Sequence, residues 1–284
     1  MGRALIAGCG FMGAELARQL QATGWDVAGV THTAESAASI SKPGLPVVAC
    51  DISDAADVKT KLASLEGIDA LVDCVSSGHG GAEAYRANYL RGARNLLDFV
   101  RPKTFLFTSS TSVYAQTDGS WVTEENSAKP PAETGRILRE TEELILTHGG
   151  IVARLAGIYG PGRWALVRKF LDGSAVIEDG GGRWVNQIHR DDAASAIAFL
   201  LNNRAAPGIY NVSDDTPLPQ RECYEILAAH FQKPLPPAGS ADPNRKRGVT
   251  NKRVSNAKLR ALGWQPRFGS MRDALVDSAP QDPY

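Results

Sequence analysis

Three glycines near the start of the chain have the spacing of a nucleotide-binding turn. Gly8, Gly10 and Gly13 form Gly-x-Gly-x-x-Gly, directly after the apolar run 4–7 and directly before the helical pattern 14–20. The first glycine permits a tight turn, the second lets the backbone approach a pyrophosphate, and the third lets the helix pack close to the strand. The N–H groups and dipole of the helix start also favour phosphate. The spacing predicts a dinucleotide site; the alternative is a tight turn without a ligand.

Further candidate contacts to this dinucleotide lie in the turn and after the second predicted strand. Phe11 and Met12 belong to the turn, and the strand over residues 26–31 ends in Thr31 and His32, where the adenosine ribose is expected. An acid here would bind the ribose 2′-hydroxyl of NAD, and an arginine would bind the 2′-phosphate of NADP. Neither is present, so both cofactors stay open, and the missing repulsion of an acid slightly favours NADP.

The next two strand ends add three candidates. The strand predicted over residues 45–52 ends in Asp51 and Ile52. Asp51 either accepts a hydrogen bond from the adenine amino group or caps the helix that starts near Asp54, and the pattern leaves both roles open. Cys74, at the end of the strand predicted over residues 68–75, completes the candidate cofactor contacts. His79, in the following loop, is expected to be exposed rather than catalytic.

Five consecutive hydroxyl residues, 108–112, follow the strand predicted over residues 104–107. Ligands of a doubly wound sheet bind at the carboxyl ends of its strands, so these hydroxyls are placed to bind a substrate oxygen. Alternatively, they only satisfy backbone groups in a sharp turn. With the glycine turn upstream, we favour the substrate site.

The elements that must position these residues alternate along the chain. Strands alternate with helical patterns, the longest of them over residues 82–100. This alternation predicts an α/β fold, with a parallel sheet covered by helices on both faces.

The composition argues against several classes of protein. The 284 residues include 31 Lys plus Arg and 31 Asp plus Glu, so no charge excess indicates a nucleic-acid partner. No apolar run reaches the length of about 18 residues that a membrane span needs, and the N-terminal pattern is not that of a signal peptide. The four cysteines are scattered, without a Cys-x-x-Cys pair, which argues against zinc and disulfides. We therefore expect a cytoplasmic protein with no bound metal.

Four motifs together resemble those of the extended short-chain dehydrogenase/reductases, the NAD-dependent epimerase/dehydratase family. The glycine turn is the first, and residues 109–114 resemble the family's Ser-Ser-x-x-Val-Tyr-Gly, with Ala115 in place of its glycine. Residues 154–162 resemble Arg-x-x-x-x-Tyr-Gly-Pro-Gly, and residues 188–192 resemble Ile-His-Val-Asp-Asp. Asn88 also begins a recognisable Asn-x-x-x-Gly-x-x-Asn-Leu-Leu segment. The resemblance covers most of the chain.

The resemblance implies a Rossmann-type doubly wound parallel sheet with a smaller C-terminal substrate lobe. An NAD(P)-binding domain is expected over residues 1–158, with 188–212 returning to extend its sheet, and the lobe over 159–187 and 213–284. The implied activity is that of an epimerase, dehydratase or reductase. Such an enzyme acts with NAD or NADP on a sugar-like or other small hydroxylated or carbonyl compound.

The chain departs from the family at its catalytic helix. Members use Tyr-x-x-x-Lys, a spacing that puts both side chains on one helix face. The lysine lowers the pKa of the tyrosine, so the phenolate acts as a base. Thr134 and Leu138 stand at the matching positions and cannot do this chemistry. Ser110 matches the catalytic Ser/Thr and has no base beside it, so the chain resembles the atypical members that lack the dyad.

Tyr114 and Tyr159 are the candidates to replace the dyad, because their segments approach the nicotinamide in the family. Each has a structural alternative, since Tyr114 can pack under the turn and Tyr159 can anchor the Gly-Pro-Gly loop. His189 is a weaker candidate, expected instead to order the start of the next helix, with Asp191 or Asp192 as its cap.

Several basic residues are candidates for binding an anionic substrate. They are Arg154, Arg163 and a cluster formed by residues 245–247 with Lys252 and Arg253. For the cluster, a solvated surface loop is the preferred interpretation.

Two functions of different classes remain open. One is the NAD(P)-dependent enzyme, with Ser110 polarising the oxygen of a small-molecule substrate and a homodimer left open. The other is a non-catalytic dinucleotide-binding sensor or assembly protein. The substrate-side motifs favour the enzyme, and the missing dyad favours the sensor.

Overall fold

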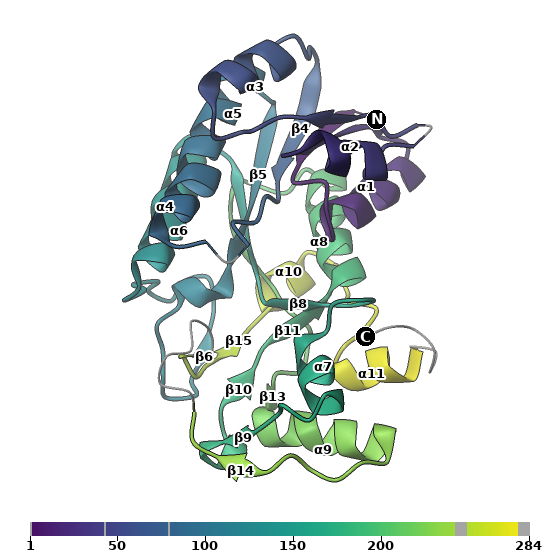
Figure 1. The fold of residues 1–284 in the computed structure, drawn as a ribbon. Helices are drawn as coiled ribbons and strands as arrows, with labels where there is room; N and C mark the ends of the chain where they lie inside the picture. The colour runs from purple at the N-terminus through teal and green to yellow at the C-terminus, as the bar shows by residue number, and fades with distance from the viewer. Residues whose placement is uncertain (1, 43, 79, 242–248, 278–284) are drawn as a thin grey trace. The chain divides into compact units, whose positions relative to one another are not determined.

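A seven-stranded sheet with strands between residues 3 and 212 is the largest sheet of the described chain in the computed structural model (Figure 1). The structure describes residues 2–42, 44–78, 80–241 and 249–277, so His79 and residues 245–247 lie outside the described residues. The strand order is β12-β7-β5-β4-β1-β2-β3. The strands are β1 (Arg3–Ala7), β2 (Asp26–Thr31), β3 (Val47–Ala49), β4 (Ile68–Asp73), β5 (Thr104–Ser110), β7 (Ile151–Leu155) and β12 (Gly208–Val212).

The order of the strands reverses beside β1. From β1 the chain builds outward through β2 and β3, then returns to place β4 on the other side of β1, and β4 and β2 both pair with β1 in parallel. Dinucleotides bind at such a reversal, at the carboxyl ends of the strands. The predicted Rossmann-type doubly wound fold is confirmed.

Helices cover both faces of this sheet, which is why its strands are apolar runs rather than alternating ones. In Figure 1, α3, α5 and α6 lie on one side of β4 and β5, and α1 and α8 lie on the other. The helical elements are α1 (Gly13–Ala22), α2 (Ala34–Ile40), α3 (Ala55–Leu62), α4 (Ala82–Tyr85), the π-helical η1 (Arg86–Arg91), α5 (Gly92–Val100), the 3₁₀ turn η2 (Thr111–Val113), α6 (Glu133–Thr147) and α8 (Arg190–Asn202).

The helix predicted over residues 82–100 is interrupted by the wide turn η1. Tyr89, inside η1, packs edge-on against Tyr85 and Phe107, with ring centroids 5.0 and 6.0 Å apart. Its hydroxyl accepts a hydrogen bond of 3.2 Å from the backbone N–H of Ser77. This wide turn thereby holds the loop that follows β4.

The chain forms two compact units and passes repeatedly between them. The first comprises residues 1–113, 128–154 and 194–210, and the second comprises 114–127, 155–193 and 211–284. Residues 114–127, expected within the dinucleotide-binding domain, thus belong to the second unit. The roles assigned to the two predicted domains stay a proposal.

The second unit is built from short strand pairs and helices. Its strand pairs are β8 (Gly157–Tyr159) with β11 (Gln187–His189), β6 (Trp121–Val122) with β15 (Arg253–Val254), β9 (Ile177–Glu178) with β14 (Ala238–Gly239), and β10 (Trp184–Val185) with β13 (Leu218–Pro219). Its other elements are α7 (Ala165–Leu171), the 3₁₀ turn η3 (Asp179–Gly181), α9 (Gln220–Phe231), α10 (Ala257–Ala261) and α11 (Met271–Asp277).

The core of the second unit is aromatic. Phe170 of α7 stacks on Tyr224 and Phe231 of α9, and Trp164, Phe268 and Met271 belong to the same buried cluster. Because these large side chains come from α7, α9, α11 and the loops between them, they fix the positions of elements far apart in the sequence.

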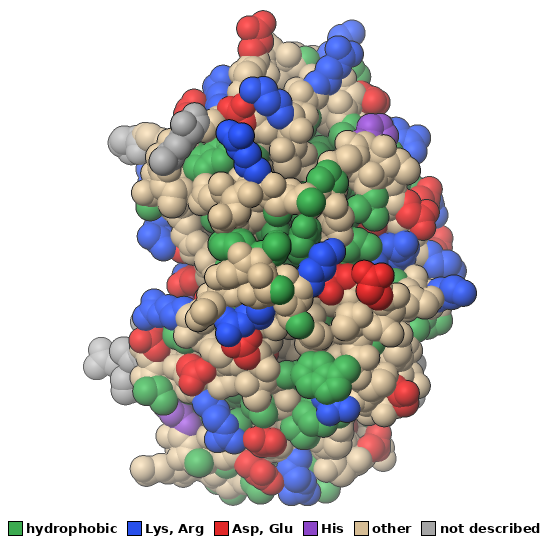
Figure 2. Space-filling view, turned by 180° about the vertical axis from the view of Figure 1, so that it is seen from behind, with side chains coloured by type: hydrophobic (Ala, Val, Ile, Leu, Met, Phe, Trp, Pro, Cys, Tyr) green, Lys and Arg blue, Asp and Glu red, His purple; other side chains and the backbone are tan. Residues whose placement is uncertain are grey.

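The surface carries charges of both signs. Figure 2 shows Lys/Arg and Asp/Glu side chains interspersed across one face of the molecule. Within the part of the chain that the structure describes, no helix combines the length and apolar character required to cross a membrane.

Candidate functional site

The glycine turn joins β1 to α1 in the first unit. Gly8 has a φ of +86°, a backbone conformation that favours glycine, and a Cβ there would lie 2.6 Å from the carbonyl carbon of Cys74. A Cβ on Gly13 would lie 2.4 Å from the carbonyl oxygen of Gly8, so only glycine lets α1 start this close to the strand. The turn and packing roles predicted for these two glycines are confirmed.

Gly10 differs from both, because the space beside it is open. A Cβ at this position would have no protein atom within 4 Å. The N-cap residue of α1, Met12, makes no side-chain capping hydrogen bond, so no cap from this residue covers the helix start. The turn therefore combines an open approach to the backbone with a helix start suited to a phosphate.

The end of β2 has the neutral character expected from the sequence. Thr31 is buried, and its hydroxyl donates to the carbonyl of Thr33 at 3.3 Å. Thr33 in turn caps α2, its side chain accepting from the N–H of Ser36. His32 is exposed, and its Nδ1 lies 3.9 Å from Oδ1 of Asp51. The structure thus brings together two of the candidate cofactor residues from adjacent strands.

Asp51 does not cap the helix after β3, so that alternative is wrong. The cap of α3 is Asp54, whose carboxylate accepts from the N–H groups of Ala56 and Asp57. The carboxylate of Asp51 accepts from the N–H of Ser53, at 2.9 Å, through Oδ1. Its Oδ2 makes no hydrogen bond to another described residue, which leaves it able to accept one from a ligand.

The loop that carries Asp51 is held by two residues of α5 whose role the sequence analysis missed. The side-chain amide of Asn95 donates to the carbonyl of Ile52 at 2.9 Å, and a Cβ on Gly92 would lie 2.7 Å from Cδ1 of Ile52. Both belong to the Asn-x-x-x-Gly-x-x-Asn-Leu-Leu segment. Ile52 is therefore a buried anchor of this loop, and the segment was the available signal for that contact.

The end of β4 contains a buried acid that the sequence analysis also missed. Cys74 is half-buried, and its N–H donates to the carbonyl of Ala7 at 2.8 Å. The side chain of Asp73 is fully buried, and its only hydrogen bond to a described residue is a 3.2 Å contact from the N–H of Val75 to Oδ1. Burial raises the pKa of Asp73 to about 7.

Some hydroxyls of residues 108–112, at the end of β5, are used in hydrogen bonds within the protein, and others remain able to bind a ligand. Thr108 donates to the carbonyl of Asp73 at 3.1 Å, and Ser109 donates to Oε1 of Glu142 at 2.5 Å. Ser110 accepts from the N–H of Ser112 at 3.1 Å, and its own proton has no acceptor among the described residues. Ser110 can therefore still donate a hydrogen bond to a substrate oxygen.

Arg154 belongs to a buried ion pair, which corrects its predicted role as a substrate contact. Its guanidinium donates to both carboxylate oxygens of Glu142, at 3.0 and 2.7 Å, and both side chains are almost fully buried. Arg139 also contacts Glu142. The arginine of this family-like motif joins β7 to α6, whereas Arg163 is exposed.

Thr134 and Leu138 both lie on α6, in the first unit, which packs against β5. Leu138 is buried in the core and Thr134 is half-buried. Neither side chain carries a group that titrates near neutral pH.

Tyr114 lies in the second unit and serves as a buried anchor. Its hydroxyl donates to Oδ1 of Asn211 at 2.8 Å, and the amide nitrogen of that side chain donates to the carbonyl of Ser255 at 3.2 Å. The backbone N–H of Asn211 donates to Glu124 at 2.7 Å. Tyr114 thus connects three segments of this unit, which matches the structural alternative considered for it.

Tyr159 also lies in the second unit, in an aromatic cluster. Its ring stacks on Trp164 at 4.3 Å and meets the ring of His189 edge-on at 5.3 Å. Its hydroxyl is buried and makes no hydrogen bond to a described residue. Burial, and then the nearby charges of Asp214, Asp192 and Asp273, raise the pKa of this phenol. Tyr159 therefore keeps its proton and can act only as a donor.

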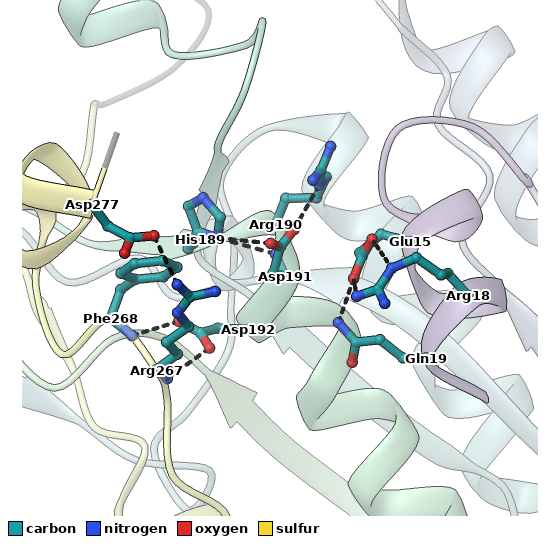
Figure 3. A network of polar contacts seen from close by, with 10 residues as sticks. All are labelled: Glu15, Arg18, Gln19, His189, Arg190, Asp191, Asp192, Arg267, Phe268 and Asp277. Carbon is teal, nitrogen blue, oxygen red and sulfur yellow. Dashed lines mark hydrogen bonds and ion pairs between the residues drawn. The ribbon is translucent and has the colours of Figure 1, made fainter. Parts of the chain in front are cut away.

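His189 orders the start of α8, as the sequence analysis expected, but the capping group is its own ring. Nδ1 accepts a 3.2 Å hydrogen bond from the N–H of Asp191, and burial lowers the pKa of the imidazole. Figure 3 shows that Asp192 instead accepts from the N–H groups of Arg267 and Phe268, at 2.7 and 3.0 Å. The prediction that Asp191 or Asp192 caps this helix is wrong.

The residues described hold no cluster of three or more His, Cys, Asp or Glu side chains suited to a metal ion.

The chain matches the pattern of the NAD dependent epimerase/dehydratase family over residues 4–213. It is similar to the protein YeeZ of Escherichia coli K12, with 31% identity over 227 residues, covering 75% of this chain and 77% of YeeZ.

Two further comparisons bear on the site. A solved structure of a candidate NAD-dependent epimerase/dehydratase from Methylobacillus flagellatus is 30% identical, with a TM-score of 0.80 and coverage of 97% of each chain. A 2′-dehydrokanamycin reductase from Streptomyces kanamyceticus is 29% identical over 200 residues, covering 64% of this chain and 53% of that protein.

Proposed function

Since the chain belongs to the NAD-dependent epimerase/dehydratase family, as an atypical member of the extended short-chain dehydrogenase/reductases, we propose that it is a nicotinamide-dinucleotide-dependent reductase of a small carbonyl compound. The observation that carries the proposal is the open space beside Gly10, in a turn where Gly8 and Gly13 are closely packed. A backbone left bare on one side is what a pyrophosphate requires.

The residues that would hold the cofactor all come from the first unit. Gly8, Gly10, Phe11, Met12 and Gly13 surround the pyrophosphate position, Thr31 and His32 the ribose, Asp51 and Ile52 the adenine, and Cys74 the end of β4. When bound, the dinucleotide supplies the hydride that a carbonyl carbon accepts. Since Thr31 and His32 present no carboxylate to repel a 2′-phosphate, we propose NADP rather than NAD.

The reductive direction is favoured by the protonation of the candidate catalytic residues. Reduction of a carbonyl needs a proton donor at the oxygen, whereas oxidation of an alcohol needs a base. Ser110 can donate a hydrogen bond to the carbonyl oxygen, and the raised pKa of Tyr159 keeps its phenol protonated, so neither supplies the base that alcohol oxidation needs. Tyr114, whose proton is already donated to Asn211, is the weaker candidate. The similarity to 2′-dehydrokanamycin reductase supports a reductase.

Two observations favour the alternative, a dinucleotide-binding sensor without turnover. Thr134 and Leu138 supply no base on α6, and the hydroxyls of Tyr114 and Tyr159 are both buried. Such a protein would bind the cofactor as tightly and transfer no hydride. A homodimer and a cytoplasmic location stay predictions for either function.

The proposal is tested by placing a side chain in the open space. Gly10→Val should weaken the binding of NADPH by about tenfold or more, because its methyl groups occupy the pyrophosphate position. Gly182→Val is the matched control, since Gly182 also has no atom within 4 Å of a Cβ position and lies in the second unit.

Calorimetry with NADPH and NADH measures both variants. Unchanged affinity of Gly10→Val would refute the cofactor site. If the wild-type protein binds the dinucleotide but reduces no member of a panel of hydroxylated aldehydes and ketones, the sensor is the correct function.

A further inference from the structure

Lys252 is a buried cation outside the proposed cofactor site. It belongs to the second unit, and only 5% of the residue is exposed. Its ammonium group donates one hydrogen bond, of 2.7 Å, to the hydroxyl of Thr250. The ammonium group has three donors, so two of them have no acceptor among the described residues. The solvated loop expected here from the sequence is therefore wrong for this lysine.

The charge that acts most on Lys252 has the same sign. Burial, and then the positive charge of Arg183, lower the pKa of Lys252 to about 8. No carboxylate of the described residues acts on it in the opposite direction. The acid close to Arg183 is Glu178, whose Oε2 lies 3.9 Å from Nε. Two cations thus share one region of this unit, and Lys252 has no counter-charge within the described chain.

The backbone around Lys252 is fixed from several sides. The amide of Asn186 donates to the carbonyl of Lys252 at 2.9 Å and accepts from the N–H of Val254 at 2.7 Å. The side chain of Asn251 accepts from the N–H of Trp184 at 2.9 Å. Residues 251–254 are therefore held against 184–186, directly after Arg183, so the two cations have defined positions.

The neighbouring Arg253 shows how this unit accommodates a cation that is structural. Its guanidinium lies over the rings of Trp121 and Trp184, 5.1 and 4.8 Å from their centroids, and its Nε donates to the carbonyl of Gly119 at 2.9 Å. Cation–π contacts and a carbonyl satisfy this charge. Lys252 has no equivalent partners among the described residues.

A buried charge without a partner destabilises a protein, because its hydration is lost and not replaced. Proteins tolerate such destabilising groups at functional sites, where a bound ligand supplies the missing partner. We propose that Lys252, with Arg183 beside it, binds an oxyanion, a phosphate or a carboxylate, carried by the substrate. That the anion belongs to the substrate rests on the proposed reductase function. The anion site itself is argued only from residues of the second unit.

The experiment uses inorganic sulfate as the probe, with chloride at equal ionic strength as reference. Thermal unfolding and calorimetry compare the wild-type protein with Lys252→Met and with Lys233→Met, in which an exposed lysine is removed. Sulfate should stabilise the wild-type protein and Lys233→Met alike. In Lys252→Met its affinity should fall by about tenfold or more, the loss expected for a charge-assisted hydrogen bond.

Stability without sulfate provides a second readout. Lys252→Met should unfold at the same temperature as the wild-type protein or higher, because the variant removes an uncompensated buried charge. In the wild-type protein, NMR of the labelled lysine side chain should show the pKa of Lys252 rising when sulfate is added, since an anion favours the charged form.

Two results would overturn the inference. One is a clear loss of stability in Lys252→Met, which would show that the lysine is satisfied within the protein. The other is sulfate affinity that is absent from the wild-type protein or unchanged in Lys252→Met. Binding of NADPH, measured on the same variants, should stay at the wild-type level, so failure of the anion site and failure of the cofactor site are distinguishable.

Discussion

Individual residues decide between roles that local sequence leaves equal. Asp51 and Asp54 are both acids before the same helix, and either could cap it by pattern. The structure gives the cap to Asp54, whose carboxylate reaches two N–H groups of α3. Asp51 is left at the end of the β3 segment with one of its carboxylate oxygens available to a ligand.

The pair Asp51→Ala and Asp54→Ala separates these roles by measurement. Asp51→Ala should weaken NADPH binding about tenfold or more, because a hydrogen bond to a charged group contributes on the order of 1.5–3 kcal/mol. Asp54→Ala should lower stability by about 1 kcal/mol, the usual loss of a cap, with affinity unchanged. Calorimetry and urea unfolding test both. A variant of Asp51 that only loses stability would remove it from the cofactor site.

Asp73 predicts a dependence of stability on pH. Its pKa is raised from 3.8 to about 7 by burial, so the folded protein holds a proton that the unfolded chain releases near pH 4. The contribution of Asp73 to the free energy of unfolding is fully present below about pH 4. It falls as the pH rises towards about 7 and is constant at higher pH. Three pKa units correspond to roughly 4 kcal/mol.

Asp73→Asn should remove this loss, because asparagine does not titrate and can still accept from the N–H of Val75. Its stability relative to the wild-type protein should therefore be greater at about pH 8 than at about pH 4.5. Urea unfolding at these two pH values measures the difference. Asp69→Asn on the same strand is the control. The pKa of Asp69 is lowered by Lys103, so it is ionised at both pH values and its substitution should have a constant effect. A constant difference for Asp73→Asn would contradict the assignment.

At the scale of elements, the junction of β5, α6 and β7 depends on one carboxylate. Glu142 on α6 binds Ser109 of β5 and Arg154 of β7, all three buried. Ser110, the proposed substrate contact, follows Ser109 directly. The network therefore positions the end of β5, and Glu142 is a positioning residue rather than a catalytic one.

Glu142→Gln should cost roughly 3–5 kcal/mol of unfolding free energy, because it leaves the buried guanidinium of Arg154 without its counter-charge. Glu143→Gln is the matched control on the same helix. Glu143 is exposed and pairs with Arg139 at 3.3 Å, so its loss should change stability by less than about 1 kcal/mol. Equal effects of the two substitutions in denaturant titrations would refute the role of Glu142.

The sequence predicted the elements of the first unit better than their contacts. Strand β2 over residues 26–31, β12 over residues 208–212 and the glycine turn follow from local pattern, since apolar runs and glycines report on backbone geometry directly. β5 is longer than predicted, because Thr108 and Ser109 find buried partners that no local pattern reveals.

The charged contacts were harder to predict because they join distant segments. Glu142 resembled any helical glutamate, although its spacing from Leu138 and Ile145 places it on the buried face of α6. Its partner Arg154 was therefore assigned to a substrate. Lys252 was assigned to solvent for a similar reason, since the sequence does not show that the side chain of Asn186 and the backbone N–H of Trp184 hold its segment.

At the scale of the whole molecule, the candidate residues are divided between the two units. The cofactor residues and Ser110 belong to the first unit, and Tyr114 and Tyr159 to the second, although Ser110 and Tyr114 are close in sequence. The chain passes between the units at residues 113–114, so a substitution on either side of this point tests a different unit.

Turnover by three variants tests which unit supplies the proton. Tyr159→Phe should lower the rate of carbonyl reduction by about tenfold or more, since it removes the protonated hydroxyl proposed to donate to the substrate oxygen. Thr134→Ala should retain nearly the full rate, because threonine supplies no proton at neutral pH. Tyr114→Phe should chiefly lower stability, by about 1–3 kcal/mol, since the buried carbonyl of Asn211 loses its donor. Steady-state kinetics with NADPH and denaturant unfolding measure the set. If Thr134→Ala abolishes turnover while both tyrosine variants keep it, the proton comes from α6 and the assignment to Tyr159 is wrong.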